Sequence, residues 1–386
     1  MKSLLPNYIS IWDAFNIFLI LPFCILVLHK GGRFRIPPTP FLIGVTAIVA
    51  ARILSLVNPM FFQPELIYSV LRYVEILVVI LIWLNIFRET DIGIISTLVL
   101  LVVFVDTTIA VAQVIFSKGV ARALGLTAGL TTMQTFGILY LFLKTRAITD
   151  KRYLRYLGII YLVFGLVLSL TRSAWITFII SSGMLFLSSP KAIKLIIIKI
   201  GIAFTFIGAG LYAVWPQMQI RVVQMLSGGG TVGVRLVLWH MVLAGFLSSP
   251  LTGIGSGAFA RNYSFLLNFS GQSLPQQYWG LSTHNEMLEA LVETGIIGTA
   301  AYLFYFIIMF NLILSRIRKL RVLSLANLDG PLAIQLAAGC TLFGVVVSDL
   351  YAQGSFSIPF MILCIMLFLG GKKETVNVGI QSKNGP

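Results

Sequence analysis

The chain has 386 residues, of which 58% are hydrophobic and only 11% are charged. About a quarter of the residues of a soluble globular domain are charged, so this composition excludes that class and indicates a polytopic membrane protein. The net charge of +15 is divided into short basic runs between apolar segments, which argues against a nucleic-acid partner and is typical of the cytoplasmic loops of membrane proteins.

Spanning helices need about 20 mostly apolar residues. By that measure the sequence predicts an all-α membrane bundle of about eleven spans, or twelve if one was missed. The predicted spans are residues 9–28, 41–57, 66–87, 92–116, 127–144, 153–170, 173–188, 193–215, 295–314, 331–349 and 356–371. Cys24, Cys340 and Cys364 all fall inside these spans, at a spacing that matches no metal site, and are predicted to be core residues.

The connections between the predicted spans alternate in charge. When the spans alternate in direction, five basic connections fall on one side, and the positive-inside rule makes that side cytoplasmic. The N-terminus is then outside and the C-terminus inside. The five connections contain Lys30, Arg33 and Arg35; Lys144, Arg146, Lys151, Arg152 and Arg155; Lys191, Lys194 and Lys199; Arg316, Arg318, Lys319 and Arg321; and Lys372 and Lys373.

One long segment lies between spans on the opposite side. We therefore divide the single integral membrane domain into N-terminal spans (1–215), a periplasmic loop (216–283), and a motif helix followed by the C-terminal spans (284–386). A Gly-rich stretch near the start of the loop precedes a predicted helix at residues 234–247. Its residues Leu236, Trp239, Leu243 and Phe246 lie at helical spacing, so this face could rest on the membrane surface or on the bundle.

The stretch at residues 283–298 is polar at its start and runs directly into an apolar segment. Thr283 and Glu286 fit a capping box, which places His284 at the first helical position, where the helix dipole favours the neutral imidazole. Glu286, Glu289 and Glu293 then share one face of the helix. His284 is the one of the three histidines that is best placed for proton chemistry, although an ordinary capped helix at the membrane surface would give the same pattern.

Several arginines also fall on the outer side. Guanidinium groups match phosphate geometry, so a neutral histidine with arginines nearby suits an anionic substrate. Arg172 begins a span where the positive-inside rule gives no reason for a cation, unless it snorkels to the interface. Arg235 begins the loop helix, where a cation needs a partner: a phosphate, or a glutamate of the 284–293 helix. The remaining outer arginines are Arg122, Arg221 and Arg261.

Two other features lead to competing interpretations. Gly253, Gly255 and Gly257 resemble a phosphate loop, but no Lys-Ser/Thr pair follows, so the sequence favours a turn over a nucleotide site. Charges inside spans are costly and usually functional. Asp106 together with the Arg72–Glu75 pair would suit a proton-coupled transporter or a lipid-linked glycan flippase, but no inverted repeat accompanies them. The other charges within predicted spans are Asp13, Arg52 and Asp349.

Three outer motifs together resemble the O-antigen ligase and polysaccharide polymerase superfamily of bacterial membrane glycosyltransferases. His284-Asn285, followed by Glu293 and Gly295, resembles its histidine motif, with ten residues between His284 and Gly295. The segment from Arg235 through Ser249 and Gly255 to Phe259 resembles the arginine-led part of the outer loop. Arg172 resembles the arginine that begins a span in the middle of the family's chain. The resemblance covers roughly residues 165–315.

The resemblance implies a helical glycosyltransferase of the C type in the bacterial inner membrane, with its active site facing the periplasm. The donor would be a glycan on undecaprenyl diphosphate and the acceptor a glycan or glycolipid, with no cofactor and no metal. His284 would be the general base on the acceptor hydroxyl, and Arg172 and Arg235 would hold the diphosphate. Asn285, Glu293 and Arg261 are further candidate site residues.

The resemblance leaves two activities open. Trp239 stands where the ligases have leucine, four positions after the loop arginine, and the single outer loop is unlike the two large loops of many polymerases. We favour an O-antigen ligase-like activity over a polymerase of polysaccharide.

Overall fold

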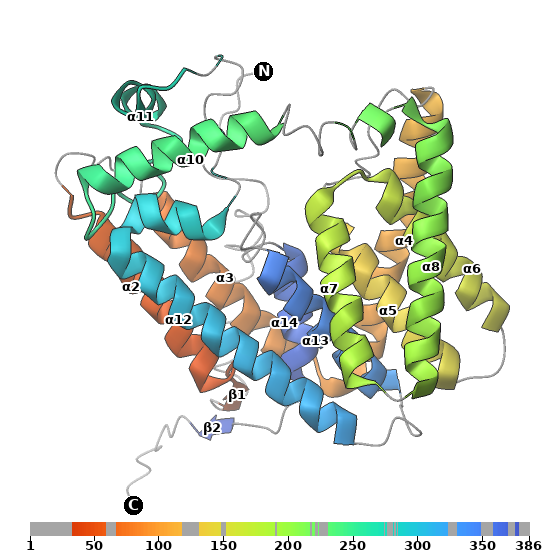
Figure 1. Cartoon of the computed structure of the whole chain (residues 1–386). Coiled ribbons are helices and arrows are strands. Elements are labelled where there is room, and N and C mark those ends of the chain that lie inside the picture. The colour runs from red at the N-terminus through yellow and green to blue at the C-terminus, as the bar shows by residue number, and fades with distance from the viewer. Residues whose placement is uncertain are drawn as a thin grey trace, which may run out of the picture.

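The computed structural model describes most of the chain between residues 33 and 377. The described residues are 33–58, 67–117, 131–147, 152–189, 191–216, 218–220, 223, 231–273, 275, 281, 283, 285–322, 330–348, 358–369 and 375–377. Their regular structure is helical, apart from a ladder of two short strands (Figure 1). The elements are β1 (Arg33–Arg35), α2 (Thr39–Ser55), α3 (Ile67–Ile86), η2 (Glu89–Asp91), α4 (Ile92–Phe116), α5 (Thr131–Ala147), α6 (Arg152–Leu168), α7 (Arg172–Ser188), α8 (Lys191–Val214), α10 (Thr231–Ser248), α11 (Tyr263–Ser270), α12 (Glu286–Val322), α13 (Gly330–Ser348), α14 (Ile358–Leu369) and β2 (Thr375–Asn377).

The helices follow the hydropathy pattern closely. Ten of the eleven predicted spans overlap a helix, while the span at 9–28 lies outside the described residues. Three described helices, Ile92–Phe116, Lys194–Val214 and Glu286–Arg318, are long and apolar enough to cross a membrane, and seven more of the described helices are shorter and apolar. The structure is that of a helical membrane protein, and the number of spans stays a prediction.

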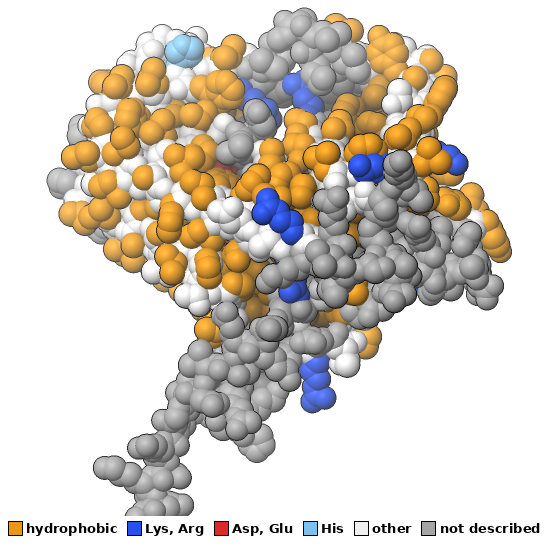
Figure 2. Space-filling model, turned by 60° about the horizontal axis from the view of Figure 1, so that its bottom comes forward, with side chains coloured by type: hydrophobic (Ala, Val, Ile, Leu, Met, Phe, Trp, Pro, Cys, Tyr) orange, Lys and Arg blue, Asp and Glu red, His pale blue; other side chains and the backbone are white. Residues whose placement is uncertain are grey.

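The surface of the bundle carries many large apolar side chains. A continuous core of buried side chains runs through α2–α8 and α12–α14. Large hydrophobic side chains also point outward, including Leu98 and Leu101 of α4 and Phe206 of α8, which is 74% exposed. Figure 2 shows hydrophobic side chains over most of the described part of one face, with lysines and arginines set apart from one another. Such a surface is suited to contact with the lipid tails of a membrane.

The two ends of the bundle differ in which elements they carry. The starts of α7, α10 and α12 lie at one end, whereas the start of α8, the end of α12 and the β1–β2 ladder lie at the other (Figure 1). The basic runs near residues 191–199 and 316–321 are therefore at the end away from α10. This arrangement agrees with the alternation of spans on which the predicted topology rests.

The segment after α8 forms a second, smaller core. The loop helix predicted at 234–247 is confirmed as α10, and α11, which was not predicted, packs beside it. Leu238, Met241 and Val242 of α10 are buried in this core together with Ile254 and Val292. Of the face that was predicted to rest on the membrane surface or on the bundle, Leu236, Trp239 and Leu243 point outward and are exposed.

Candidate functional site

The first turn of α12 starts two residues later than the sequence predicts. The helix begins at Glu286, and the cap is Asn285, whose Oδ1 accepts a hydrogen bond from the Leu288 backbone N–H at 3.0 Å. The Asn285 carbonyl accepts the first intrahelical bond, from the Glu289 N–H at 2.9 Å. The prediction of Thr283 as the N-cap is therefore wrong. The buried Thr283 hydroxyl instead donates to the Asn285 carbonyl at 2.8 Å and fixes the entry to the helix.

His284 itself lies outside the described residues, so its role as general base stays a prediction. Its two neighbours, Thr283 and Asn285, are both held by the hydrogen bonds at the helix entry. The amide oxygen of Asn285 caps the helix. This candidate site residue therefore holds the backbone next to His284 in sequence.

A sharp bend at Gly295 divides α12 into a short outer arm and a long second arm (Figure 1). Gly295 has φ 63° and ψ −159°, a region that only glycine enters readily. At the bend, backbone N–H and C=O groups of α12 form hydrogen bonds with the loop that follows α10. The N–H of Ile296 donates to the Pro250 carbonyl at 2.9 Å, and the N–H of Ile254 donates to the Val292 carbonyl at 2.9 Å. The histidine motif and the arginine-led loop therefore meet through their backbones.

The glycine-rich loop is a structural turn, as the sequence favours. Gly253, Gly255 and Gly257 all have positive φ. The Gly255 N–H donates to the Glu293 carbonyl at 3.0 Å, and the Gly253 N–H donates to the Ser249 carbonyl at 2.9 Å. A Cβ on Gly253 would lie 2.3 Å from the Glu293 carbonyl carbon, so only glycine permits this approach. These amides serve the helix contact and are not available to a phosphate.

The two arginines that we expected to bind a diphosphate are brought near each other. Arg172 begins α7, Arg235 lies in the first turns of α10, and both are half-buried. Burial and the neighbouring Arg172 guanidinium both lower the pKa of Arg235. Within the described residues neither arginine forms a hydrogen bond or an ion pair, so the glutamate partner considered for Arg235 is not found there. Two adjacent cations of this kind favour an anion between them.

The other polar residues predicted on the outer side do not join this pair of arginines in the described part of the chain. Arg261 is half-buried in the turn before α11, where its backbone N–H donates to the Ala258 carbonyl at 3.2 Å. Arg122 and Arg221 lie outside the described residues. His240 is exposed on α10, with Nδ1 2.8 Å from the Leu236 carbonyl, in line with a surface role.

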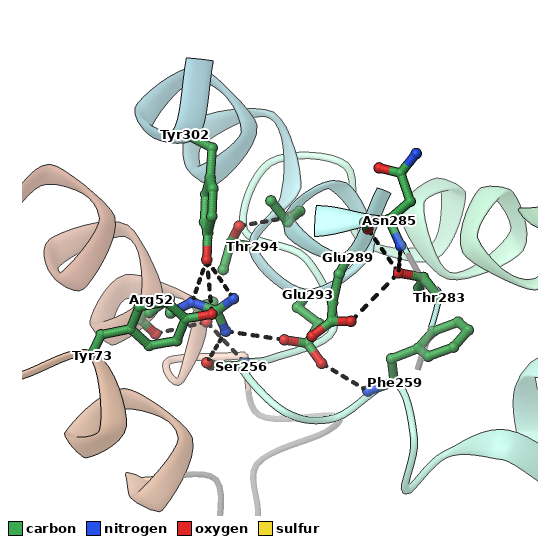
Figure 3. Close-up of polar contacts among 12 residues, drawn as sticks. Arg52, Tyr73, Ser256, Phe259, Thr283, Asn285, Glu289, Glu293, Thr294 and Tyr302 are labelled. Atoms are coloured by element: carbon green, nitrogen blue, oxygen red, sulfur yellow. Dashed lines mark hydrogen bonds and ion pairs between the residues drawn. The ribbon is translucent and has the colours of Figure 1, made fainter. Parts of the chain in front are cut away.

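The acidic face of the α12 outer arm points into the protein. Glu286 and Glu293 are buried, and Glu293 forms an ion pair with Arg52 of α2 at 3.1 Å (Figure 3). The sequence marks Arg52 as an unusual charge within a span and Glu293 as part of the histidine motif, but 241 residues separate them and no pattern pairs them. The carboxylate of Glu293 is paired with Arg52, so Glu293 is a candidate for holding the site in place and not for contacting the substrate.

Of the charges that motivated a transporter, Asp106 is described in full. Its side chain is buried in α4 beside the buried Thr107. The side chain of Arg72, and Asp13 and Asp349 altogether, lie outside what the structure describes.

A comparison with known protein families gives a match. No curated protein matches the sequence. Residues 157–303 match the family described as O-Antigen ligase. The matched segment is less than half of the chain, but it includes Arg172, Arg235, His284 and the bend at Gly295. Its position agrees with the resemblance to the O-antigen ligase and polysaccharide polymerase superfamily found from the three motifs, and this match supports membership of that superfamily.

Proposed function

We propose that the protein is an O-antigen ligase-like glycosyltransferase, which moves a glycan from undecaprenyl diphosphate to an acceptor at the periplasmic face of the bacterial inner membrane. The observation that carries this proposal is the closeness of Arg172 and Arg235, two half-buried cations with no acidic partner among the described residues. They come from α7 and α10, both of which start at the end of the molecule where the histidine motif enters α12 (Figure 1). The family match supports the same activity.

The proposed reaction is a single displacement at the glycan's anomeric carbon. The acceptor hydroxyl oxygen attacks that carbon while His284 takes the hydroxyl proton. The bond from the carbon to the diphosphate oxygen breaks, and its electron pair leaves with the lipid diphosphate. Arg172 and Arg235 stabilise the negative charge that develops on the leaving oxygen, since a guanidinium fork can contact two phosphate oxygens at once. No group from outside the chain is needed to balance the step.

We expect Arg172→Lys and Arg235→Lys each to lower kcat/KM for glycan transfer by at least about 100-fold, because a point charge does not replace a bidentate fork. Purified protein would be incubated with undecaprenyl-diphosphate glycan and acceptor, and the products separated by size. Arg88→Lys, an exposed arginine of the α3–α4 connection, is the control and should retain full activity. Full turnover by both site variants would remove the diphosphate-binding role.

The products of the same assay separate the two activities of the superfamily. Transfer of one preformed glycan to a glycolipid would support a ligase, while lengthening of the glycan on its own lipid would identify a polymerase. Because the single outer loop and Trp239 leave both open, the acceptor must be varied in the assay.

We also expect undecaprenyl diphosphate without a glycan to raise the Tm of the detergent-solubilised protein. Ligand at 100 times its Kd stabilises a folded protein by about 2.7 kcal/mol. An anion between the two arginines would also relieve the repulsion that lowers the pKa of Arg235. The double variant Arg172→Ala/Arg235→Ala should lose this shift, and an equal shift in the wild type and the variant would show that the lipid binds elsewhere.

A further inference from the structure

Arg52 is held by side chains from three parts of the chain (Figure 3). Its Nη1 donates to the Ser256 hydroxyl at 2.7 Å and to Glu293 Oε2 at 3.1 Å. Its Nε and Nη2 donate to the Tyr302 hydroxyl at 3.1 and 2.7 Å. The guanidinium carbon lies 4.1 Å from the centre of the Tyr73 ring, and the Tyr302 hydroxyl donates onward to the Tyr73 hydroxyl at 2.9 Å. Every nitrogen of the guanidinium therefore has an acceptor.

These contacts join two bodies of the molecule. The first is the outer unit, which we define as α10, the loop 249–258 and the outer arm of α12, and which shares the smaller core. The second is the bundle, to which α2, α3 and α7 contribute core residues. Arg52 of α2 binds Ser256 in the loop, Glu293 before the bend and Tyr302 after it. Ser55, also of α2, accepts a further hydrogen bond from the Ser256 N–H at 3.1 Å.

The buried position of Arg52 argues against direct contact with substrate. Its side chain is only 2% exposed, and its charge is neutralised by Glu293, which is 4% exposed. The other Glu293 oxygen, Oε1, accepts from the Phe259 N–H at 3.4 Å. By contrast, Arg172 and Arg235 are half-buried and have no such partners in the described part of the chain. The charge of Arg52 is therefore used inside the protein.

We propose that Arg52 and Glu293 are positioning residues for glycan transfer, which fix the outer unit on the bundle so that the reacting groups converge. Arg235 and the entry to the histidine motif belong to the outer unit, whereas Arg172 belongs to α7 of the bundle. The contacts of Arg52 cross the boundary between the two and set the separation of Arg172 from Arg235 and from the entry to the histidine motif. This inference rests on the proposed function.

The test must separate positioning from stability. Arg52→Met or Glu293→Gln alone leaves a buried charge unpaired, and each should lower the yield of folded protein. The double variant Arg52→Met/Glu293→Gln removes both charges of the ion pair together and should fold. Per folded molecule, we expect its kcat to fall about 100-fold, because a misplacement of about 1 Å can cost that much, and its KM for the lipid donor to rise. A folded double variant with wild-type kcat and KM would overturn the proposal.

A matched control removes an arginine of α12 that lies away from the Arg52 contacts. Arg316 lies in the second arm, where its Nη2 donates to Gln335 Oε1 at 3.3 Å, far along the helix from the bend. Arg316→Met should leave kcat per folded molecule unchanged. An equal loss of kcat in Arg316→Met and in the double variant would show that removing an arginine far from the bend has the same effect, and would contradict the positioning role.

A second readout is independent of activity. The backbone N–H of Ile297 donates to the Leu251 carbonyl at 3.4 Å, which joins α12 to the loop. The side chains of both residues are exposed. In a background without Cys24, Cys340 and Cys364, the pair Leu251→Cys/Ile297→Cys should react with a short thiol crosslinker in high yield. The yield should fall at least twofold when Arg52→Met/Glu293→Gln is added. An unchanged yield would overturn the proposal, whereas wild-type turnover by His284→Ala would defeat the proposed function and leave the crosslink result standing.

Discussion

His284→Ala is expected to abolish glycan transfer while the protein stays folded in the membrane. A positioned general base contributes roughly 10²–10⁴-fold to a rate, and in the proposed reaction no second base takes the acceptor proton. The loss should appear in kcat, with KM for the donor nearly unchanged, because in the proposed reaction the diphosphate is held by Arg172 and Arg235. The measurement is transfer from undecaprenyl-diphosphate glycan by purified wild type and variant at equal concentration of folded protein.

The same assay, combined with a second variant, distinguishes transfer from transport. Asp106 is a buried carboxyl group in the middle of α4 and is the residue that best suits a proton-coupled transporter. Asp106→Asn should keep measurable glycan transfer. Complete loss of function in Asp106→Asn, with His284→Ala tolerated, would favour a transporter or flippase over the transferase.

Gly295→Ala is expected to destabilise the protein by at least about 3 kcal/mol and to separate the outer loop from α12. Its φ and ψ cost a residue with a Cβ about 1–3 kcal/mol. The added Cβ would also lie 2.4 Å from the Leu251 carbonyl oxygen and 2.7 Å from the Gly253 nitrogen, so the backbone must move. Thermal unfolding in detergent measures the loss of stability, and the thiol crosslink between positions 251 and 297 measures the separation.

Gly208→Ala provides the matched control for this variant. Gly208 lies inside α8, and an added Cβ there meets nothing within 4 Å. Alanine is favoured over glycine in a helix by about 1 kcal/mol, so the control should be as stable as the wild type or slightly more stable. Equal stability of Gly295→Ala and wild type, with the crosslink preserved, would show that the bend can form without glycine.

Hydropathy alone predicted most of the helices, because burial in lipid demands long apolar runs with a satisfied backbone. The loop helix at 234–247 was predicted to within a few residues of α10. The eight-residue α11 was missed, since its aromatic residues form no long periodic run. Local signals fail where two residues can serve one role: Thr283 and Asn285 are both good caps, and the structure selects Asn285.

The support of the site was much harder to predict than its motifs. The motifs indicated Arg172, Arg235 and Glu293 one by one, each from its place in the chain. The pairing of Arg52 with Glu293 depends on how α2 packs against α12, which the local sequence does not encode. An arginine within a span signals that an acidic partner exists, and the histidine motif holds several carboxylates, but only the packing identifies which one is paired.

The seam between the loop at 249–258 and the bend of α12 has a consequence for how relatives can diverge. Both sides of the seam are fastened by backbone hydrogen bonds, together with the side-chain contacts of Arg52. In sequence, the stretch between α11 and Thr283 connects the two sides of the seam. Doubling the length of such a connection costs only about 0.6 kcal/mol. Insertions in this stretch should therefore destabilise the fold little. Relatives could change their acceptor preference there while the contact between the loop and α12 is preserved.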